Sequence, residues 1–328
     1  MEVFPMVMVP TVRGPVDVAD LGTTFMHEHI FVLTADVQQN YADEWDEEAK
    51  VADAVNRLTE LRALGVQTIV DPTVVGLGRN IPRIARINAQ VDINILVATG
   101  VYTYHDVPFF FHHRGPALDP NLPDPMVDLF VRDLTDGISG TGIRAALLKC
   151  AVDHDGMNPG VERVLKAVAA AHRQTGAPIM VHTHPGTKRG LEVAALLGEH
   201  GVEPARVQLA HSGDTTDADH LQQLADMGFL LGMDRFGIDT VLATPERVAT
   251  VVELCRRGYA GSMVLSHDAA CYLDWVDPNI LPFGLPNWHY KHIHQAVLPA
   301  LREQGVTEEQ ITTMLVDNPR RYFSGPAA

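Results

Sequence analysis

Six side chains of the types that bind metal ions are spread along this chain, each near the end of a predicted strand. They are His27, His29, Lys149, His182, His211 and Asp268. Residues so far apart in sequence meet only if the strands that carry them close around a common axis. A barrel of alternating strands and helices does this, and its reaction centre lies at the C-terminal ends of the strands. The pattern therefore predicts an α/β fold, the (β/α)8 or TIM barrel, with a metal-dependent reaction centre.

Short apolar strands alternate with amphipathic helices from about residue 25 onward, as in parallel βα proteins. The eight predicted strands are Thr24–Val32, Gln67–Asp71, Ile93–Gly100, Ile143–Lys149, Pro178–His182, Val207–His211, Phe229–Asp234 and Met263–Asp268. Two of the helices have clear apolar stripes, which are Val51, Val55, Leu58 and Leu61 ahead of Gly65, and Val248, Val251, Val252 and Cys255 ahead of Gly258. No low-complexity linker divides the chain, so we expect residues 1–328 to form a single domain.

Composition excludes several classes of function. The net charge of −16, from 25 basic and 41 acidic residues, argues against a nucleic-acid partner. The three cysteines, Cys150, Cys255 and Cys271, are odd in number and form no CxxC pair, which fits a reducing cytosol. No apolar run is long enough to span a membrane. The apolar N-terminus is interrupted at Glu2, Pro5 and Pro10 and lacks a basic region, so we expect no signal peptide and a cytoplasmic protein.

The first pair of candidate ligands is His27 and His29. Residues two apart on a strand point to the same face, here the barrel interior, and Glu28 points the other way. An isolated His-x-His motif is weak evidence for a metal site. In the apolar segment FMHEHIFVL, however, two inward imidazoles need partners, and a metal ion satisfies both.

Lys149 closes the predicted fourth strand and shares a face with Ile143, Ala145 and Leu147. A lysine that projects into a barrel interior favours its neutral amine form. Neutral amines react with carbon dioxide to give a carbamate, which could bridge two cations. A Schiff-base lysine or a buried ion pair are the other interpretations. Four histidines aimed at the same space favour the bridging carbamate.

The remaining candidates close strands five, six and eight. His182 and His184 share a face, so spacing alone does not say which of them binds metal. His211 ends the sixth strand. Asp268 could bind one metal and accept a proton from a metal-activated water. His267 lies on the opposite face, and we expect it to pack against helices.

Two long connections lie on the predicted catalytic face. The segment 102–125 carries Phe109–Phe111, and the segment 269–288 carries Tyr272, Trp275 and Phe283. Long apolar loops at a barrel mouth favour a substrate cleft, although loops that merely pack on each other, or a dimer interface, remain alternatives.

The order His-x-His, Lys, His, His, Asp resembles the amidohydrolase superfamily, and most closely its phosphotriesterase-like lactonase branch. The resemblance covers nearly the whole chain. It is carried by MHEHIFV, GVYTY, AHSGDTTD, GMDRFG, LSHDA, PNWHY and DNPRRYF.

This resemblance implies a binuclear centre. His27, His29 and Asp268 would hold the more buried metal, His182 and His211 the more exposed one, and N6-carboxylated Lys149 would bridge them. It prefers His182 over His184. It also implies that Tyr102 hydrogen-bonds the substrate and that Arg235 shapes the cleft; the alternatives are loop packing for Tyr102 and an ion pair with Asp234 or Asp239 for Arg235. Zinc is the first choice of metal, with cobalt, iron or manganese as alternatives.

The implied function is a lactonase that hydrolyses N-acyl homoserine lactones by attack of a metal-bridging hydroxide, with phosphotriesterase activity as a side reaction. Such an enzyme would quench quorum signals, and the family expectation is a homodimer. A dedicated phosphotriesterase (aryldialkylphosphatase) is the first alternative. A mononuclear deaminase lacks the lysine, so Lys149 counts against it. A catalytically silent binding barrel would have lost ligands, and none is missing.

Overall fold

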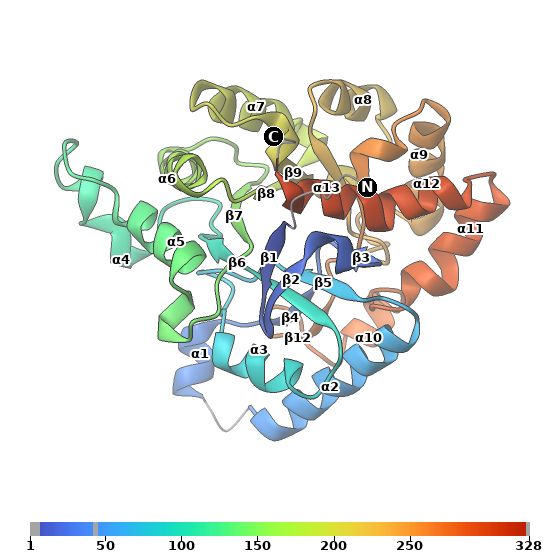
Figure 1. Cartoon of the computed structure of the whole chain (residues 1–328), viewed down its shortest axis with the longest axis horizontal. Coiled ribbons are helices and arrows are strands. Elements are labelled where there is room, and N and C mark those ends of the chain that lie inside the picture. The colour runs from blue at the N-terminus through green and yellow to red at the C-terminus, as the bar shows by residue number, and fades with distance from the viewer. Residues whose placement is uncertain (1–6, 42–44, 326–328) are drawn as a thin grey trace, which may run out of the picture.

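The computed structural model describes residues 7–41 and 45–325, so Glu2 and Pro5 lie outside the described residues. Eight parallel strands form a nearly closed barrel surrounded by helices (Figure 1), which confirms the predicted TIM-barrel fold. In barrel order they are β3 (Thr24–Phe25), β5 (Thr68–Asp71), β6 (Asn94–Gly100), β7 (Leu147–Val152), β8 (Ile179–Thr183), β9 (Val207–Ala210), β10 (Leu230–Met233) and β11 (Met263–Leu265).

The first and last strands of the barrel are interrupted where they meet. β4 (His29–Val32) continues the line of β3, and β12 (Ala270–Leu273) continues that of β11. These two extensions pair in parallel, with Ala270 opposite His29. Between them, the Asp268 amide donates to the His27 carbonyl at 3.0 Å, and the His29 amide donates to the Ala269 carbonyl at 2.8 Å. These backbone bonds join the two ends of the sheet.

Helices form the outer layer (Figure 1), and the longer ones bury apolar residues in the core. The longer ones are α2 (Glu47–Ala63), α3 (Ile81–Asn88), α5 (Pro125–Thr135), α6 (Pro159–Thr175), α7 (Arg189–Glu199), α8 (Ala218–Asp226) and α9 (Thr244–Arg256). The shorter ones are α1 (Ala35–Asn40), α4 (Phe109–His112), α10 (Leu281–Gly284), α11 (Leu298–Glu303), α12 (Glu308–Thr312) and α13 (Asn318–Ser324), and an antiparallel hairpin of β1 (Met8–Thr11) and β2 (Gly14–Asp17) precedes the barrel.

The predicted apolar stripes are the buried faces of α2 and α9. Val51, Leu58 and Leu61 are buried in α2, as are Val248 and Val251 in α9. The Asp46 side chain caps α2 by accepting from the Ala49 amide. Amphipathic helices of this kind gain most of their stability from the face that they bury.

The fourth strand is displaced from its predicted position. We expected Ile143–Lys149, but the strand runs from Leu147 to Val152, so Lys149 lies within it and does not close it. The reason is tertiary pairing: the apolar residues Cys150–Val152 continue the ladder opposite Val181–Thr183 of β8. The predicted first strand, Thr24–Val32, is likewise two shorter strands.

Two further expectations concern the cysteines and the membrane. Cys150, Cys255 and Cys271 are all buried free thiols, so the chain has no disulfide bond among them. Over residues 7–41 and 45–325, none of the helices combines the length and the apolar character that a membrane span requires.

Gly100 gives a test of how closely β6 and β7 pack. It lies opposite Lys149 in the ladder, at φ +147°, and an added Cβ would come within 1.8 Å of the Lys149 carbonyl oxygen. We expect Gly100→Ala to lower the free energy of unfolding by about 1–3 kcal/mol, measured by thermal unfolding. The control is Gly261→Ala, where a Cβ meets nothing within 4 Å. Equal stability of the two variants would contradict this packing.

Candidate metal centre

The predicted site residues share one cavity of about 190 Å³ at the C-terminal ends of the strands. All eight line it: His27, His29, Tyr102, Lys149, His182, His211, Arg235 and Asp268. His184, which spacing could not separate from His182, does not line this cavity and bonds Thr187 at 2.9 Å instead. The barrel topology alone brings together residues separated by up to 241 positions.

His27, His29 and Asp268 form the first ligand group. The Nε2 atoms of His27 and His29 lie 3.1 and 3.2 Å from the same oxygen, Asp268 Oδ1. Burial alone would lower the pKa of His29, but the carboxylates of Asp268 and Asp71 raise it to about 9. A metal ion bound here would have to displace the proton that His29 carries near neutral pH.

His182 and His211 form the second group, with ring centroids 4.4 Å apart. Burial lowers the pKa of His182 to about 4 and that of His211 well below its ordinary value. Both imidazoles are therefore neutral at pH 7, which is the form that binds metal. His211 has φ +66°, a left-handed conformation. It therefore lies in the turn after β9, whereas we predicted that it would be the last residue of the strand.

Lys149 lines the same cavity as these histidines and is 1% exposed. Its Nζ has no hydrogen-bond partner among the described residues. Burial lowers the pKa of this amine to about 8. A buried amine without a partner is costly, and a second group on Nζ, such as a carboxyl, would resolve that cost.

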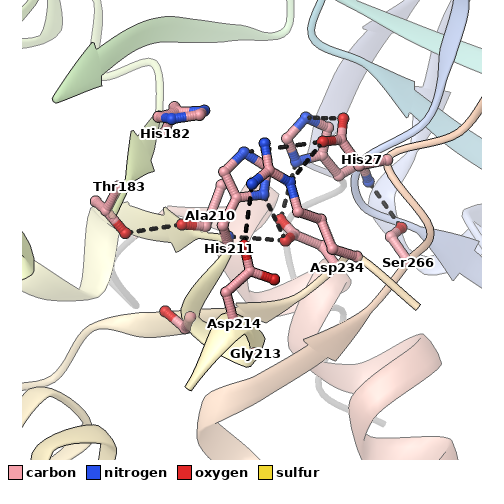
Figure 2. A network of polar contacts seen from close by, with 12 residues as sticks. His27, His182, Thr183, Ala210, His211, Gly213, Asp214, Asp234 and Ser266 are labelled. Atoms are coloured by element: carbon pink, nitrogen blue, oxygen red, sulfur yellow. Dashed lines mark hydrogen bonds and ion pairs between the residues drawn. The ribbon is translucent and has the colours of Figure 1, made fainter. Parts of the chain in front are cut away.

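Asp234 is a fully buried carboxylate that holds one histidine of each group (Figure 2). Its Oδ2 lies 2.8 Å from His27 Nδ1, and its Oδ1 lies 3.0 Å from His211 Nδ1 and accepts from the His211 amide at 2.7 Å. Because a carboxylate only accepts, both rings donate through Nδ1. In the neutral form their Nε2 lone pairs are then free for a ligand in the cavity.

This arrangement fits a cation. His27 donates through Nδ1, so its Nε2 and Asp268 Oδ1 are two acceptors 3.1 Å apart. Acceptors at that distance repel unless a proton or a metal ion lies between them. The described residues contain two groups of closely spaced metal-ligand atoms, His27–His29–Asp268 and His27–His211–Asp234. The imidazole and carboxylate set suits zinc and its neighbours.

Asp268 is also part of an ion-pair chain. Arg235 Nε donates to Asp268 Oδ2 and its Nη1 to Asp214 Oδ2, both at 3.0 Å. Asp214 is held in turn by the buried Arg247 at 2.6 Å. The partners of Arg235 are thus Asp214 and Asp268, and not Asp234 or Asp239 as the ion-pair alternative supposed. Burial would raise the pKa of Asp268, but His27 and its other partners hold it well below the usual range.

Tyr102 lies at the rim of the second group. Its hydroxyl is 3.2 Å from His182 Nδ1 and also contacts the Tyr104 hydroxyl. Burial raises the pKa of Tyr102 well above its ordinary value. The phenol therefore stays protonated and can donate a hydrogen bond into the cavity. On the other side of His182, Asp153 contacts Nε2.

The chain matches the phosphotriesterase family over residues 7–323. It belongs to that family. A phosphotriesterase homology protein from Mycobacterium tuberculosis is 56% identical over 314 residues, 95% of this chain and 96% of that protein. An aryldialkylphosphatase from Saccharolobus solfataricus is 36% identical over 95% of this chain and 98% of its own length. The solved structure of the phosphotriesterase from Mycobacterium tuberculosis has a TM-score of 0.95 and 55% identity, covering 96% of this chain and 98% of that one.

Membership of the phosphotriesterase family confirms that the chain is a hydrolase. The family depends on a binuclear metal centre, and the described residues include candidate metal-binding groups of histidine and aspartate. Which residues bind each ion is part of the proposal below.

The apolar wall of the cavity differs from what we expected. Phe109, Phe110 and Phe283 are 80%, 57% and 87% exposed and do not line it, while Phe111 is buried elsewhere. Tyr272 packs against Trp45. The apolar wall consists of Val32, Leu77, Ile238, Leu273, Trp275, Val276 and Trp288. The sequence left open which loop aromatics face the cleft, because strand alternation does not apply to loops, and of those named only Trp275 lines the cavity.

Asp234, Asp214 and Arg247 were missed as site residues. The sequence names the first two within GMDRFG and AHSGDTTD, but their role depends on contacts between strands that spacing does not show. Arg247 lies on α9, outside any motif. Its role is visible only in the structure, where the side chain is buried.

We expect Asp234→Asn to weaken metal binding by about 10–100-fold, because an amide has one accepting oxygen for the three donors that Asp234 satisfies. Metal affinity measured against a competing chelator tests this. The matched control is Asp239→Asn, five residues on, whose carboxylate bonds Thr244 and Asn287 away from the cavity. Unchanged affinity in both variants would remove Asp234 from the centre.

Proposed function

We propose that the chain is a metal-dependent lactonase that hydrolyses N-acyl homoserine lactones and related lactones, with phosphotriesters as secondary substrates. The observation that carries this is the mixed lining of the cavity, in which eight ligand and polar residues, here called the floor, occur together with seven apolar residues, here called the wall. A homoserine lactone likewise combines a polar ring with an apolar acyl chain. Each methylene buried against the wall contributes about 0.8 kcal/mol.

In this proposal His27, His29 and Asp268 hold the more buried ion, and His182 and His211 hold the more exposed one. Carboxylated Lys149 bridges the two, which would give its buried Nζ a role that the protein alone does not supply. Zinc is the first choice. When bound, the two ions would acidify a water and polarise the substrate carbonyl.

The protein residues supply orientation and proton transfer. The apolar wall directs the acyl chain toward Trp275, which is 51% exposed at the mouth. Tyr102, kept protonated by burial, donates to the carbonyl oxygen as negative charge develops there. Water adds to the acyl carbon, Asp268 takes up its proton, and the ring C–O bond breaks. That proton then passes to the leaving alkoxide, so the product is an open-chain hydroxy acid.

Arg235 orients Asp268 for this step. The guanidinium bonds the Oδ2 oxygen of Asp268, while Oδ1 faces His27 and His29. Arg235 itself is held by Asp214, so the carboxylate that moves the proton cannot rotate freely. An arginine does not lose a proton in this setting, and its role is therefore positioning.

A dedicated phosphotriesterase is the second candidate, and it is favoured by the similarity to a phosphotriesterase homology protein and an aryldialkylphosphatase. The same centre can direct a water at a phosphorus ester. The silent binding barrel is disfavoured because the ligand set is complete. That the protein is a cytoplasmic homodimer stays a prediction.

Metal content per chain, measured with turnover of a long-chain acyl homoserine lactone and an aryl phosphotriester on one sample, tests the function. We expect two metal ions and lactone turnover well ahead of phosphotriester turnover. The reverse preference with two ions would make the chain a phosphotriesterase. No metal and no turnover would contradict both.

Lys149 gives a pH-dependent test of the carbamate. Its pKa of about 8 lies below the ordinary 10.5, so the neutral amine is present above pH 8 and lost as the pH falls below it. The neutral fraction is about one tenth at pH 7 and about nine tenths at pH 9. At an equal concentration of dissolved ¹³CO2, we expect metal-free protein given zinc to form the ¹³C-carbamate faster at pH 9 than at pH 7, followed by NMR. Lys149→Ala should fold, show no such signal, and lose the second metal and most turnover; full activity without added carboxylate would contradict the bridge.

A further inference from the structure

Glu28 lies between the two histidines of the His-x-His motif, but its side chain points away from the cavity. It is 0% exposed, as is its partner His267. Neither lines the cavity, and the ligand assignment uses neither. The burial of a carboxylate is costly unless hydrogen-bond donors surround it.

The donors around Glu28 come from the residues on both sides of Asp268. Its Oε1 accepts from the His267 amide at 2.9 Å and from His267 Nδ1 at 2.6 Å, and its Oε2 accepts from the Ala269 amide at 3.2 Å. Glu28 is itself flanked by His27 and His29. One carboxylate, next to two candidate ligands, thus holds the backbone on either side of the third.

The backbone of Asp268 explains why a side chain is needed there. Asp268 has φ +54°, a left-handed conformation that is strained for a residue other than glycine. β11 ends at Leu265, and pairing resumes only at Ala270. The amides of His267 and Ala269 therefore fall in the gap between two ladders, and a buried amide without an acceptor is destabilising. Glu28 is the acceptor for both.

We propose that Glu28 is a positioning residue for the more buried metal site, which fixes Asp268 against His27 and His29. Through its two oxygens the carboxylate sets the strained turn that aims Asp268 Oδ1 at the Nε2 atoms of both histidines. The inference rests on the ligand assignment in the proposed function, but not on the identity of the substrate.

The geometry of His267 makes the substitution Glu28→Gln informative. His267 Nε2 accepts from the Ile293 amide at 3.0 Å, so its Nδ1 carries the proton and donates to Glu28. Three donors thus face the two oxygens of Glu28. In Glu28→Gln one end of the side chain becomes a donor, so at least one of the three loses its acceptor whichever way the amide turns.

The test is stepwise zinc binding to the full chain, measured against a competing chelator. We expect Glu28→Gln to weaken the step of the buried site by about 10–100-fold and to leave the other step unchanged. The step that survives in His182→Ala, which lacks a ligand of the exposed site, identifies the buried one. Glu28→Asp, which keeps the charge but is one methylene too short to reach both amides, should give the same selective loss and serves if Glu28→Gln does not fold.

Asn318→Ala is the matched control for a merely structural effect. Asn318 is buried and holds the same strand at its other end, donating to the carbonyls of Ala260 and Met263 at 2.8 and 2.6 Å. It should lower the thermal unfolding midpoint without changing either zinc step. Equal weakening of both steps by Glu28→Gln, or of neither, overturns the positioning role. A chain that binds no zinc overturns the whole centre, whereas two zinc steps without lactone turnover overturn only the proposed substrate.

Discussion

The cost of burying charge governs the open end of this barrel. Burial disfavours the charged forms of Lys149, His182, His211, Asp234 and Asp268, and it lowers the pKa of the lysine and the two histidines. Burial would raise the pKa of the two aspartates, but their charged partners outweigh it and hold the pKa below the ordinary value. The carboxylates stay ionised because histidines and Arg235 face them. The histidines are held by carboxylates from behind. Of these five side chains, only that of Lys149 has no hydrogen-bond partner among the described residues, so a group added to its Nζ would give a buried amine the partner that it lacks.

The two residues that leave their strands in left-handed conformation, His211 and Asp268, are both candidate ligands. A strand with regular alternation would aim every second side chain at the barrel axis, at a depth fixed by the register. A turn at the strand end lifts the side chain toward the cavity and frees the backbone groups around it. Side chains then take over as acceptors: Asp234 for the His211 amide, and Glu28 for those on either side of Asp268. The carboxylates of Asp234 and Glu28 therefore stabilise the turns at which these two strands end.

The fold and the six candidate metal ligands could be predicted from local pattern, whereas Tyr102 and Arg235 came from the family resemblance. Apolar runs of strand length, stripes of helical period and polar residues near strand ends suffice for a barrel, and the barrel brings the eight predicted residues together. The register of the fourth strand could not be predicted, since Cys150–Val152 are extended only because β8 pairs with them. Asp234, Asp214 and Glu28 were not predicted as site residues because their role lies in bonds between strands. The aromatic residues that line the cavity could not be picked out from the loops, because sequence spacing does not fix the direction of a side chain in a loop.

The floor and the wall of the cavity contribute differently to the proposed reaction. In the proposed function, the floor activates water and polarises a carbonyl or phosphoryl oxygen. The wall determines which substrate binds long enough to react, because the binding free energy that it contributes grows with the apolar area that the substrate buries. The wall includes Trp275, which is 51% exposed, and Trp288, whose indole donates to the His267 carbonyl at 2.9 Å. The same residue, His267, thus joins the wall to the Glu28 contact, so a change in the apolar wall near Trp288 acts on the backbone that positions Asp268 as well as on the substrate.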